Sequence, residues 1–375
     1  MMEQHTGIEN FDFQIVRFTG QFRKKYSEVQ QDLAELGRIQ DFESWYDWWC
    51  QKAEEYEKIG LMEVAMVYYR AALFYLNIAD KRKDVMYGKM RSCFEQVYMD
   101  LDFQHVQVPY QGDFLPATYI AKEGARKTLL IFGGFDAYLE ELVGMFLPLQ
   151  EEVDYNLLIF DGPGQGVVSH HGPRFHHDYE KAVTAVLDSF QLSEVDALGV
   201  SWGGYFVLRA AAFEKRIKTC ICFNIFYSSM DALQLQTHPV EFSLLKLALF
   251  FKQRRLINTF INLKAKNDLD LAWMVQQGMD ITGTESPYDF IVEAKKHTVE
   301  PILKQIDQEC FLMAGSQDFY VPSWRLADMK SKLTGAKSVE TCLFTEQTGG
   351  VLHCQIDRPD LGLAAISAYL KKKIA

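Results

Sequence analysis

Three residues with the potential for covalent catalysis lie at the ends of predicted strands. Ser201 stands between two glycines in GVSWGG (199–204), after an apolar run and before the helix-forming segment YFVLRAAAF. Asp318 ends the run CFLMAGSQD, and His353 follows the next strand in a glycine-containing loop. A serine hydroxyl becomes a nucleophile when a histidine removes its proton and an acid orients that histidine. The set predicts attack on a carbonyl by Ser201, with His353 as base and Asp318 as orienting acid.

The setting of Ser201 supports this interpretation more than the motif itself. A G-x-S-x-G match arises by chance in roughly one chain in ten of this length. Here the motif joins a buried-type strand to a helix, which is the context of a strained, exposed nucleophile. Taken singly, Asp318 could cap a helix and His353 could be a loop histidine beside Cys354. All three residues at strand ends, in the order serine, aspartate, histidine, favour the catalytic interpretation.

Donors for a developing oxyanion are also present. TLLIFGG (128–134) leaves its strand through Gly133 and Gly134, which allows the backbone N–H of Phe135 to point toward the nucleophile. The N–H of Trp202, directly after Ser201, is the second expected donor. A tight turn between strand and helix explains the two glycines as well, and the two interpretations are compatible.

The elements that must position these residues alternate between strand and helix. HVQVPYQGDFLPATYIAKEG predicts a hairpin of two strands around Gly112. Six apolar, β-rich runs follow, separated by helical segments: 128–134, 156–164, 195–201, 218–226, 310–318 and 340–347. Continuous apolar strands separated by helices predict an α/β fold, with a mostly parallel sheet and helices on both faces.

Two helical regions accompany this core. Residues 1–100 repeat apolar residues at three- and four-residue intervals and predict an N-terminal helical accessory domain. Residues 228–305 predict a helical cap inserted into the core, since a structureless loop of this length is uncommon in a compact domain. The core itself is expected to comprise residues 101–227 and 306–375.

These residues resemble one branch of the α/β-hydrolases. The motifs that carry the resemblance are GVSWGGY, GGFDAY, DGPGQG (161–166), AGSQDFYVP and HCQ (353–355), behind an all-helical N-terminal region. They are similar to the dihydroxypseudooxynicotine hydrolase type of C–C bond hydrolases and to the polyketide-shortening hydrolases of fungal pigment synthesis. The resemblance implies the α/β-hydrolase fold, triad roles for Ser201, Asp318 and His353, and oxyanion donors at Phe135 and Trp202.

Three further signals are left open. Some members of the branch use an acidic residue near the nucleophile to position substrate, and Asp231 is the nearest candidate here.

SHHGPRFHHDYE holds four histidines without metal-ligand spacing, so no metal or other cofactor is predicted and the histidines are expected to border the active-site mouth. FFKQRRLINTFINLKAK (250–266) carries five basic residues and no acid. Either it is a solvated helix face, or its apolar side closes over the pocket while its charge attracts an anionic or carrier-linked substrate.

Composition and charge exclude several classes of protein. The chain of 375 residues has a net charge of −11, which disfavours nucleic-acid binding. Its longest nearly apolar run, LLKLALFF, is too short to span a bilayer, and the N-terminus has no secretory signal pattern. Seven scattered cysteines are typical of buried thiols in a reducing compartment. A cytoplasmic protein without nucleic-acid or membrane partners is predicted, and a homodimer through the helical domain is left open.

The sequence therefore predicts a serine hydrolase that forms an acyl-enzyme on an apolar or aromatic small-molecule substrate. The bond cleaved is an ester, a thioester or a C–C bond beside a ketone, and the residues do not choose among these. One alternative is an acyltransferase or cyclase of polyketide-type metabolism that excludes water from the same acyl-enzyme. The other is a ligand-binding protein on the same fold without turnover, against which the intact triad argues.

Overall fold

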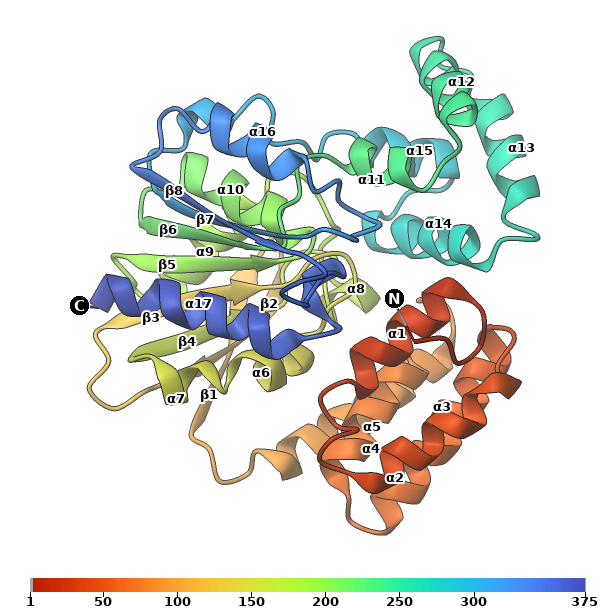
Figure 1. Ribbon diagram of the computed structural model, residues 1–375, viewed down its shortest axis with the longest axis horizontal. Coiled ribbons are helices and arrows are strands. Elements are labelled where there is room, and N and C mark those ends of the chain that lie inside the picture. Colours follow the sequence, from red (N-terminus) through yellow and green to blue (C-terminus); the bar gives the residue numbers. More distant parts are fainter. Residues whose placement is uncertain (1–2, 375) are drawn as a thin grey trace. The chain divides into compact units, whose positions relative to one another are not determined.

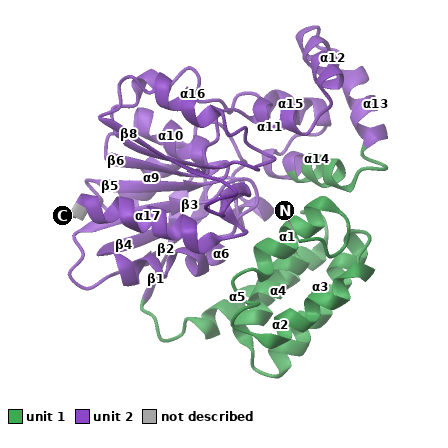
Figure 2. Ribbon diagram, in the orientation of Figure 1, with its two compact units in different colours: residues 1–102, 265–277 green, residues 103–264, 278–375 purple. Residues whose placement is uncertain are grey.

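The computed structural model describes residues 3–374, which divide into two compact units (Figures 1 and 2). The first unit comprises residues 1–102 and 265–277, and the second comprises residues 103–264 and 278–375. The segment 265–277 lies inside the range 228–305 that the sequence predicts as a cap, yet it packs with the N-terminal helices.

The first unit is helical. Its elements are α1 (Glu9–Thr19), α2 (Ser27–Asp32), the 3-10 helix Leu33–Arg38, α3 (Phe42–Lys58), α4 (Met62–Ala72), α5 (Lys81–Val97) and the first part of α14 (Leu269–Thr282). The side chain of Asp41 caps α3 by accepting the N–H of Ser44 at 2.8 Å, which satisfies a group that the helix leaves unpaired. Trp45 of α3 is fully buried, and Trp273 stacks on Phe74 with ring centroids 4.9 Å apart. Aromatic packing therefore holds this unit together.

An eight-stranded sheet forms the centre of the second unit. The strands are β1 (Phe103–Tyr110), β2 (Asp113–Ile120), β3 (Lys127–Phe132), β4 (Tyr155–Phe160), β5 (Val195–Val200), β6 (Ile217–Phe223), β7 (Glu309–Gly315) and β8 (Ser338–Phe344). Their order is β1-β2-β4-β3-β5-β6-β7-β8. The pairs β1–β2 and β2–β4 are antiparallel, and all other pairs are parallel. The hairpin at Gly112 thus adds an antiparallel edge to a parallel sheet.

Helices cover both faces of this sheet. They are α6 (Leu139–Phe146), α7 (Leu149–Glu152), α8 (Val168–His171), α9 (Glu180–Ser189), α10 (Gly203–Phe213), α16 (Arg325–Lys332) and α17 (Pro359–Ile374). Alternate strand residues such as Phe132 and Phe160 share one core with α9, α10 and α16. On the opposite face Phe311 of β7 stacks on Tyr369 of α17, with centroids 4.6 Å apart. Because both faces are covered, β4 and β5 are buried at every residue.

Between β6 and β7 the chain forms a run of helices. These are α11 (Ser229–Leu235), α12 (Pro239–Phe250), α13 (Arg254–Lys264), α14 and α15 (Pro287–Ala294), followed by the 3-10 helix Leu303–Gln305. A last 3-10 helix, His353–Gln355, follows β8. In Figure 1, α12 and α13 form a hairpin away from the sheet.

The structure confirms the fold class expected from the sequence. Each of the six apolar runs contains one parallel strand, with bounds that differ by a few residues because the runs continue into the loops after the strands. Within residues 3–374, no helix is both long enough and apolar enough to cross a membrane.

Candidate active site

Ser201 occupies a sharp corner between β5 and α10. Its φ is +61°, a left-handed conformation that costs a residue with a Cβ about 1–3 kcal/mol. Two hydrogen bonds hold the corner: Ser201 N–H donates to the carbonyl of Phe223 at 2.8 Å, and Gly204 N–H donates to the carbonyl of Ser201 at 2.8 Å. The strained turn lifts the hydroxyl out of the sheet, as a nucleophile requires.

The glycines around Ser201 allow the strand and the helix to approach closely. A Cβ on Gly199 would lie 1.9 Å from the carbonyl oxygen of Gly203, and a Cβ on Gly204 would lie 2.2 Å from that of Asn224. Side chains at these positions would therefore force β5, α10 and the end of β6 apart. The glycines of GVSWGG are required by packing as well as by the turn.

Ser201, His353 and Asp318 form one chain of hydrogen bonds. Nε2 of His353 lies 2.7 Å from Oγ of Ser201, and Nδ1 of His353 lies 2.7 Å from Oδ2 of Asp318. The carboxylate can only accept at Nδ1, so the imidazole proton lies on Nδ1 and Nε2 is free to accept the serine proton. The structure therefore brings together the three residues that the sequence singled out.

The Asp318 carboxylate is held from several sides. Its Oδ1 accepts the backbone N–H groups of Tyr320 and Val321 at 2.8 and 2.9 Å. Its Oδ2 also accepts the side-chain amide of Asn224, from the end of β6, at 2.6 Å. These donors fix the carboxylate in the one orientation that reaches His353.

The electrostatic environment of His353 favours the charged imidazole. Burial by itself lowers the pKa of this side chain, but the Asp318 carboxylate and the neighbouring Cys354 outweigh that effect. The net pKa of His353 lies well above the ordinary value for histidine. A base in this setting can hold a proton taken from Ser201.

Gln165 of the DGPGQG motif orders the loop opposite Ser201. Its Nε2 donates to the carbonyls of Gly133 and Gly134 at 2.7 and 3.0 Å. Its Oε1 accepts the N–H of Gly162 at 2.9 Å and the hydroxyl of Tyr179 at 2.8 Å. All four hydrogen-bonding positions of this buried amide are therefore used. Because the carbonyls of Gly133 and Gly134 are held by Gln165, the conformation of the loop that leads to Phe135 is fixed.

Trp202 is held on three sides beside Ser201. Its ring stacks between Phe135 and Phe226, at centroid distances of 5.4 and 4.4 Å. Its indole N–H donates to Nδ1 of His297 at 2.9 Å. Complete burial lowers the pKa of His297 well below its ordinary value, so the ring is neutral and its proton lies on Nε2.

The backbone N–H of Trp202 precedes the first turn of α10, where helix N–H groups have no partner within the helix. A Cβ on Gly134 would lie 2.7 Å from this nitrogen, so glycine keeps the space beside it open. The N-terminus of α10 also favours negative charge. This position is suited to a developing oxyanion.

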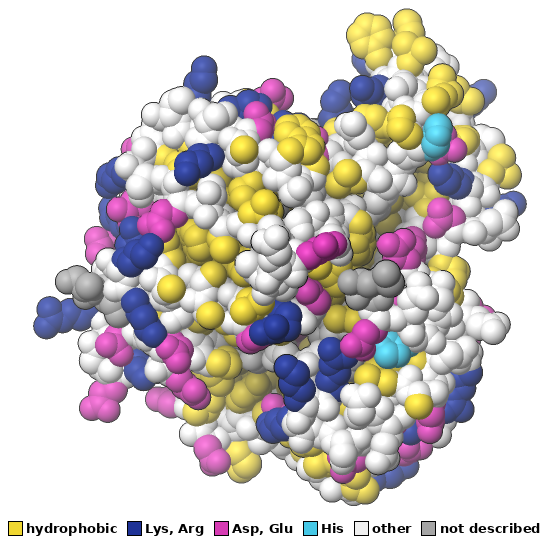
Figure 3. Space-filling view, viewed as in Figure 1, with side chains coloured by type: hydrophobic (Ala, Val, Ile, Leu, Met, Phe, Trp, Pro, Cys, Tyr) yellow, Lys and Arg dark blue, Asp and Glu magenta, His cyan; other side chains and the backbone are white. Residues whose placement is uncertain are grey.

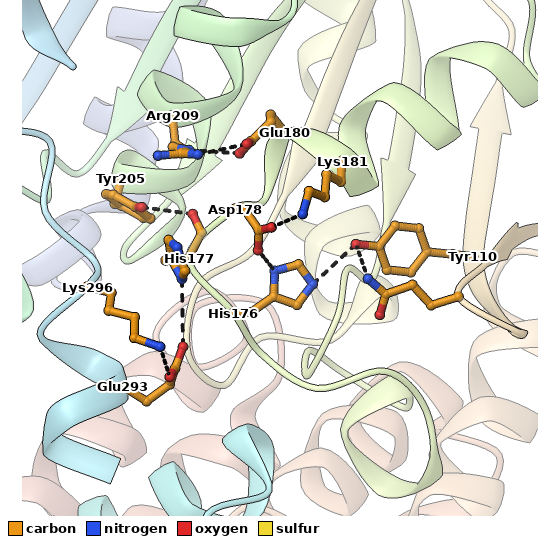
Figure 4. A network of polar contacts seen from close by, with 11 residues as sticks. Tyr110, His176, His177, Asp178, Glu180, Lys181, Tyr205, Arg209, Glu293 and Lys296 are labelled. Atoms are coloured by element: carbon orange, nitrogen blue, oxygen red, sulfur yellow. Dashed lines mark hydrogen bonds and ion pairs between the residues drawn. The ribbon is translucent and has the colours of Figure 1, made fainter. Parts of the chain in front are cut away.

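The loop that carries His176 and His177 is tied to three elements (Figure 4). Nε2 of His176 lies 3.2 Å from the hydroxyl of Tyr110 in β1. The carbonyl of His177 accepts the hydroxyl of Tyr205 in α10 at 2.8 Å, and Nδ1 of His177 lies 3.7 Å from Oε1 of Glu293 in α15. These contacts connect α15 to β1 and to α10, the helix that follows Ser201.

Three of the four histidines of this stretch have separate polar partners. Nε2 of His170 lies 2.8 Å from the hydroxyl of Tyr138, whereas Nδ1 of His176 contacts the carboxylate of Asp178. Among the residues that the structure describes, no three His, Cys, Asp or Glu side chains are grouped so as to hold a metal ion.

Asp231, the open candidate for a substrate-positioning acid, is engaged by Arg325. The guanidinium donates to both carboxylate oxygens, at 2.7 and 2.9 Å, and lies 3.7 Å from the centre of the Tyr227 ring. This paired geometry joins α11 to α16. The Asp231 carboxylate is therefore held in an ion pair between these two helices, and its role toward substrate stays a prediction.

The middle of the chain matches a known family. Residues 127–344, more than half of the chain, match the family model described as the alpha/beta hydrolase fold. The chain belongs to this family. It is 27% identical to an alpha/beta hydrolase, xenA, of Xenoacremonium sinensis, over 78% of this chain and 77% of the relative. It is also 27% identical to 20-hydroxy-prefusarin hydrolase FUS2 of Gibberella moniliformis, over 75% of each chain.

Solved structures share the fold of this α/β-hydrolase, including its helical region. The 2,6-dihydroxy-pseudo-oxynicotine hydrolase superposes with a TM-score of 0.66 at 19% identity, over 92% of each chain. AbyA5 superposes with a TM-score of 0.68 at 16% identity, over 94% of this chain and 93% of the other. The resemblance to the branch with C–C bond and polyketide hydrolases is thereby confirmed, and the relatives are named hydrolases.

Three residues of the site were not identified from the sequence as functional. Gln165 lies in a motif that was recognised, but the motif did not indicate what the amide contacts. Asn224 lies at the end of a predicted strand, and this position alone indicates only weakly that a polar residue belongs to the site. His297 had no signal, because its contact with Trp202 joins residues 95 positions apart.

The close approach at Gly199 can be tested by adding one methyl group. We expect Gly199→Ala to lower the free energy of unfolding by about 3 kcal/mol or more, or to prevent folding, because the Cβ would overlap the Gly203 carbonyl. Soluble yield and urea denaturation followed by circular dichroism measure this. The control is Gly88→Ala in α5, where a Cβ meets nothing within 4 Å and stability should change by at most about 1 kcal/mol. Equal stability of both variants would contradict the packing argument.

Proposed function

We propose that this α/β-hydrolase is a serine hydrolase that acts through an acyl-enzyme on Ser201. The observation that carries the proposal is the continuous hydrogen-bonded chain from Ser201 through His353 to Asp318, with 2.7 Å at each link. The strained turn at Ser201 and the Trp202 N–H at the start of α10, beside which Gly134 leaves space, support it further. A ligand-binding role without turnover would require none of these features.

In the first half of the reaction, Nε2 of His353 takes the proton of Ser201 while Oγ attacks the substrate carbonyl. Asp318 keeps the imidazole in the required tautomer and stabilises its positive charge. The backbone N–H groups of Trp202 and Phe135 stabilise the oxyanion. His353 then gives the proton to the leaving group as the bond to the carbonyl carbon breaks.

In the second half, water attacks the acyl-enzyme. His353 accepts a proton from the water, the hydroxide adds to the acyl carbon, and collapse of the intermediate returns the proton to Oγ of Ser201. The proton on His353 can be transferred to an alkoxide, a thiolate or a carbanion leaving group. This site could therefore cleave an ester, a thioester or a C–C bond beside a ketone.

An apolar or aromatic acyl group fits the surroundings of the nucleophile. Trp202 and Phe135 are only half-buried, and Phe175 and Phe290 pack against Phe135 at centroid distances of 6.2 and 6.4 Å. The names of two similar proteins, 20-hydroxy-prefusarin hydrolase and 2,6-dihydroxy-pseudo-oxynicotine hydrolase, refer to small organic substrates. Both agree with the proposed substrate class.

Labelling of the nucleophile tests the proposal directly. A fluorophosphonate probe should modify the wild-type chain once, at Ser201, and Ser201→Ala should neither be labelled nor hydrolyse a nitrophenyl ester. Intact-mass and peptide mass spectrometry locate the modification. Ser331→Ala, at an exposed hydroxyl in α16, is the matched control and should behave as wild type. Labelling at another residue, or Ser201→Ala activity within tenfold of wild type, would reject the proposal.

The role of Asp318 predicts both a rate and a pH effect. The base acts when it is neutral, so the raised pKa of His353 predicts that kcat/KM falls on the acid side with an inflection above the ordinary histidine value. Asp318→Asn removes the charge that raises this pKa. We expect the inflection to move to lower pH and kcat to fall on the order of a thousandfold or more.

The matched control for Asp318→Asn is Glu346→Gln. Glu346 is exposed after β8 and accepts only from Gln317 in the contacts observed, at 2.6 Å. Its replacement should leave both kcat and the pH profile unchanged. If Asp318→Asn left kcat unchanged and Glu346→Gln abolished activity, the orienting acid would be Glu346, on the loop after β8, and not Asp318.

Gln165 is proposed as a positioning residue that acts through the Gly133–Phe135 loop. Gln165→Glu keeps the acceptor for Gly162 and Tyr179 but removes the donor to the two carbonyls. We expect kcat to fall by about tenfold to a thousandfold, because the N–H of Phe135 would be displaced from the oxyanion. Little change in KM is expected, because this N–H binds the transition state and not the ground state.

Gln150→Glu is the control for this variant, since Nε2 of Gln150 also donates to two backbone carbonyls, at 3.0 Å each, away from the nucleophile. It should leave kcat near the wild-type value. Equal losses of kcat in the two variants, accompanied by equal losses of thermal stability, would assign Gln165 a purely structural role.

A further inference from the structure

The α12–α13 hairpin exposes an apolar surface that the catalytic chemistry does not use. The exposed side chains are Val240, Leu244, Leu247, Phe250, Phe251, Leu256, Phe260 and Leu263, with exposed fractions between 48% and 79%. In Figure 3, hydrophobic side chains gather at the end of the molecule formed by these helices. In the first unit, by contrast, the large exposed apolar residues are only Ile59, Val85, Met99 and Leu101 among those described, and they are scattered along the sequence.

These side chains form a stripe on each helix. Val240, Leu244, Leu247 and Phe251 are spaced four, three and four residues apart along α12 and its end, which places them on one face. On α13, Leu256, Phe260 and Leu263 follow the same spacing. We define these seven residues with Phe250 as the hairpin stripe.

A second side of each helix is already packed against the protein. Phe242 of α12 is buried, as are Ile257 and Ile261 of α13. The helices are therefore apolar on two sides, and the sequence of α12, PVEFSLLKLALF, has only three polar residues. A helix that is apolar all round is typical of a buried helix. The sequence of α12 thus fits a helix whose outer face is also covered.

This geometry differs from the expectation that the apolar side of segment 250–266 closes over the pocket. Phe250, Phe251, Leu256 and Phe260 face solvent, because the chain turns at 251–253 and only Ile257 and Ile261 point inward. Of the cations in this segment, Arg254 forms an ion pair with Asp289, and Lys264 pairs with Glu241 at 2.8 Å.

The size of the stripe suits a protein partner. Eight side chains that each expose on the order of 100 Å² give about 800 Å², which is more than a typical patch on a monomer. About 800 Å² is also the share that each partner contributes to a stable interface of standard size. The stripe therefore has the area that a stable dimer requires.

We propose that the hairpin stripe is a self-association surface on which the α12–α13 hairpin of a second copy of this chain docks. Two antiparallel helices with parallel apolar stripes are half of a four-helix bundle, and a two-fold axis places the stripe of one copy on the same stripe of the other. Apolar surface then meets apolar surface along the whole length of both hairpins.

The placement of charge favours a second copy over a lipid surface. Helices that bind membranes carry Lys and Arg along the borders of the apolar stripe. Here Lys252 lies in the turn and Arg254 and Arg255 begin α13, so all three lie at the end of the hairpin. Lys264, at the other end of α13, pairs with Glu241 of α12. Within α12 the one cation, Lys246, lies 5.0 Å from the centre of the Phe242 ring, on the side away from the stripe. A net charge of −11 on the chain also opposes binding to an anionic membrane.

The mass of the full chain in solution tests this proposal. We expect a dimer by size-exclusion chromatography with light scattering and by sedimentation velocity. Leu247→Glu combined with Phe251→Glu should raise the dimer dissociation constant by about a hundredfold or more, because two charges would be buried in each half of the interface. Both residues are exposed in the single chain, so the melting temperature measured at concentrations where both proteins are monomeric should be unchanged.

Two control variants distinguish the hairpin stripe from the rest of the surface. Phe114→Glu combined with Leu343→Glu changes two exposed apolar residues outside the hairpin and should leave the dimer intact. Lys252→Gln combined with Arg255→Gln should also leave it intact, since these cations lie outside the stripe. A wild-type chain that is still monomeric at about 50 µM would overturn the proposal. A dimer that persists in the Leu247→Glu/Phe251→Glu variant would also overturn it. The same holds if the monomer sediments with phosphatidylserine vesicles and the Lys252→Gln/Arg255→Gln variant does not.

Discussion

The close contact between the end of β5 and the start of α10 is the constraint on which the site depends. Ser201 adopts φ +61° because the chain must reverse from strand to helix within two residues. That reversal is tolerated because Gly199 and Gly204 leave room for the carbonyls of Gly203 and Asn224. The same contact places the hydroxyl above the sheet and the N–H of Trp202 beside it. The strain of one residue thus sets the positions of both the Ser201 hydroxyl and the N–H next to it.

The second requirement is a rigid chain of polar contacts behind the hydroxyl. Asp318 is buried, and a buried carboxylate is costly unless it is fully hydrogen-bonded. Backbone N–H groups after β7, an amide from the end of β6 and the imidazole after β8 supply those bonds. Three neighbouring strand ends are therefore connected through one carboxylate. The orientation of His353 follows from this network and not from the loop on which it lies.

The loops opposite Ser201 are held in a comparable way. Gln165 connects the turn after β3 to the turn after β4, with every donor and acceptor of its amide satisfied inside the protein. His297 contacts Trp202 from the segment after α15. Burial of His297 keeps its imidazole neutral, so that Nδ1 can accept a hydrogen bond from the indole N–H of Trp202. Around these polar groups, stacked aromatic rings provide the apolar wall of the site. The arrangement combines fixed hydrogen bonds with a surface suited to apolar groups.

Sequence by itself determined the fold class and the positions of Ser201, Asp318 and His353. It could do so because buried parallel strands have a recognisable apolar pattern, and the carboxyl ends of such strands meet at one edge of the sheet. Tertiary structure alone decided which polar groups support these residues, since Asn224 and Asp318 are 94 positions apart and Trp202 and His297 are 95 positions apart. It also decided that the apolar residues of segment 250–266 face outward. Periodicity indicates that a helix has an apolar face, but the direction in which that face points is set by the turn at 251–253 and by the packing of Ile257 and Ile261.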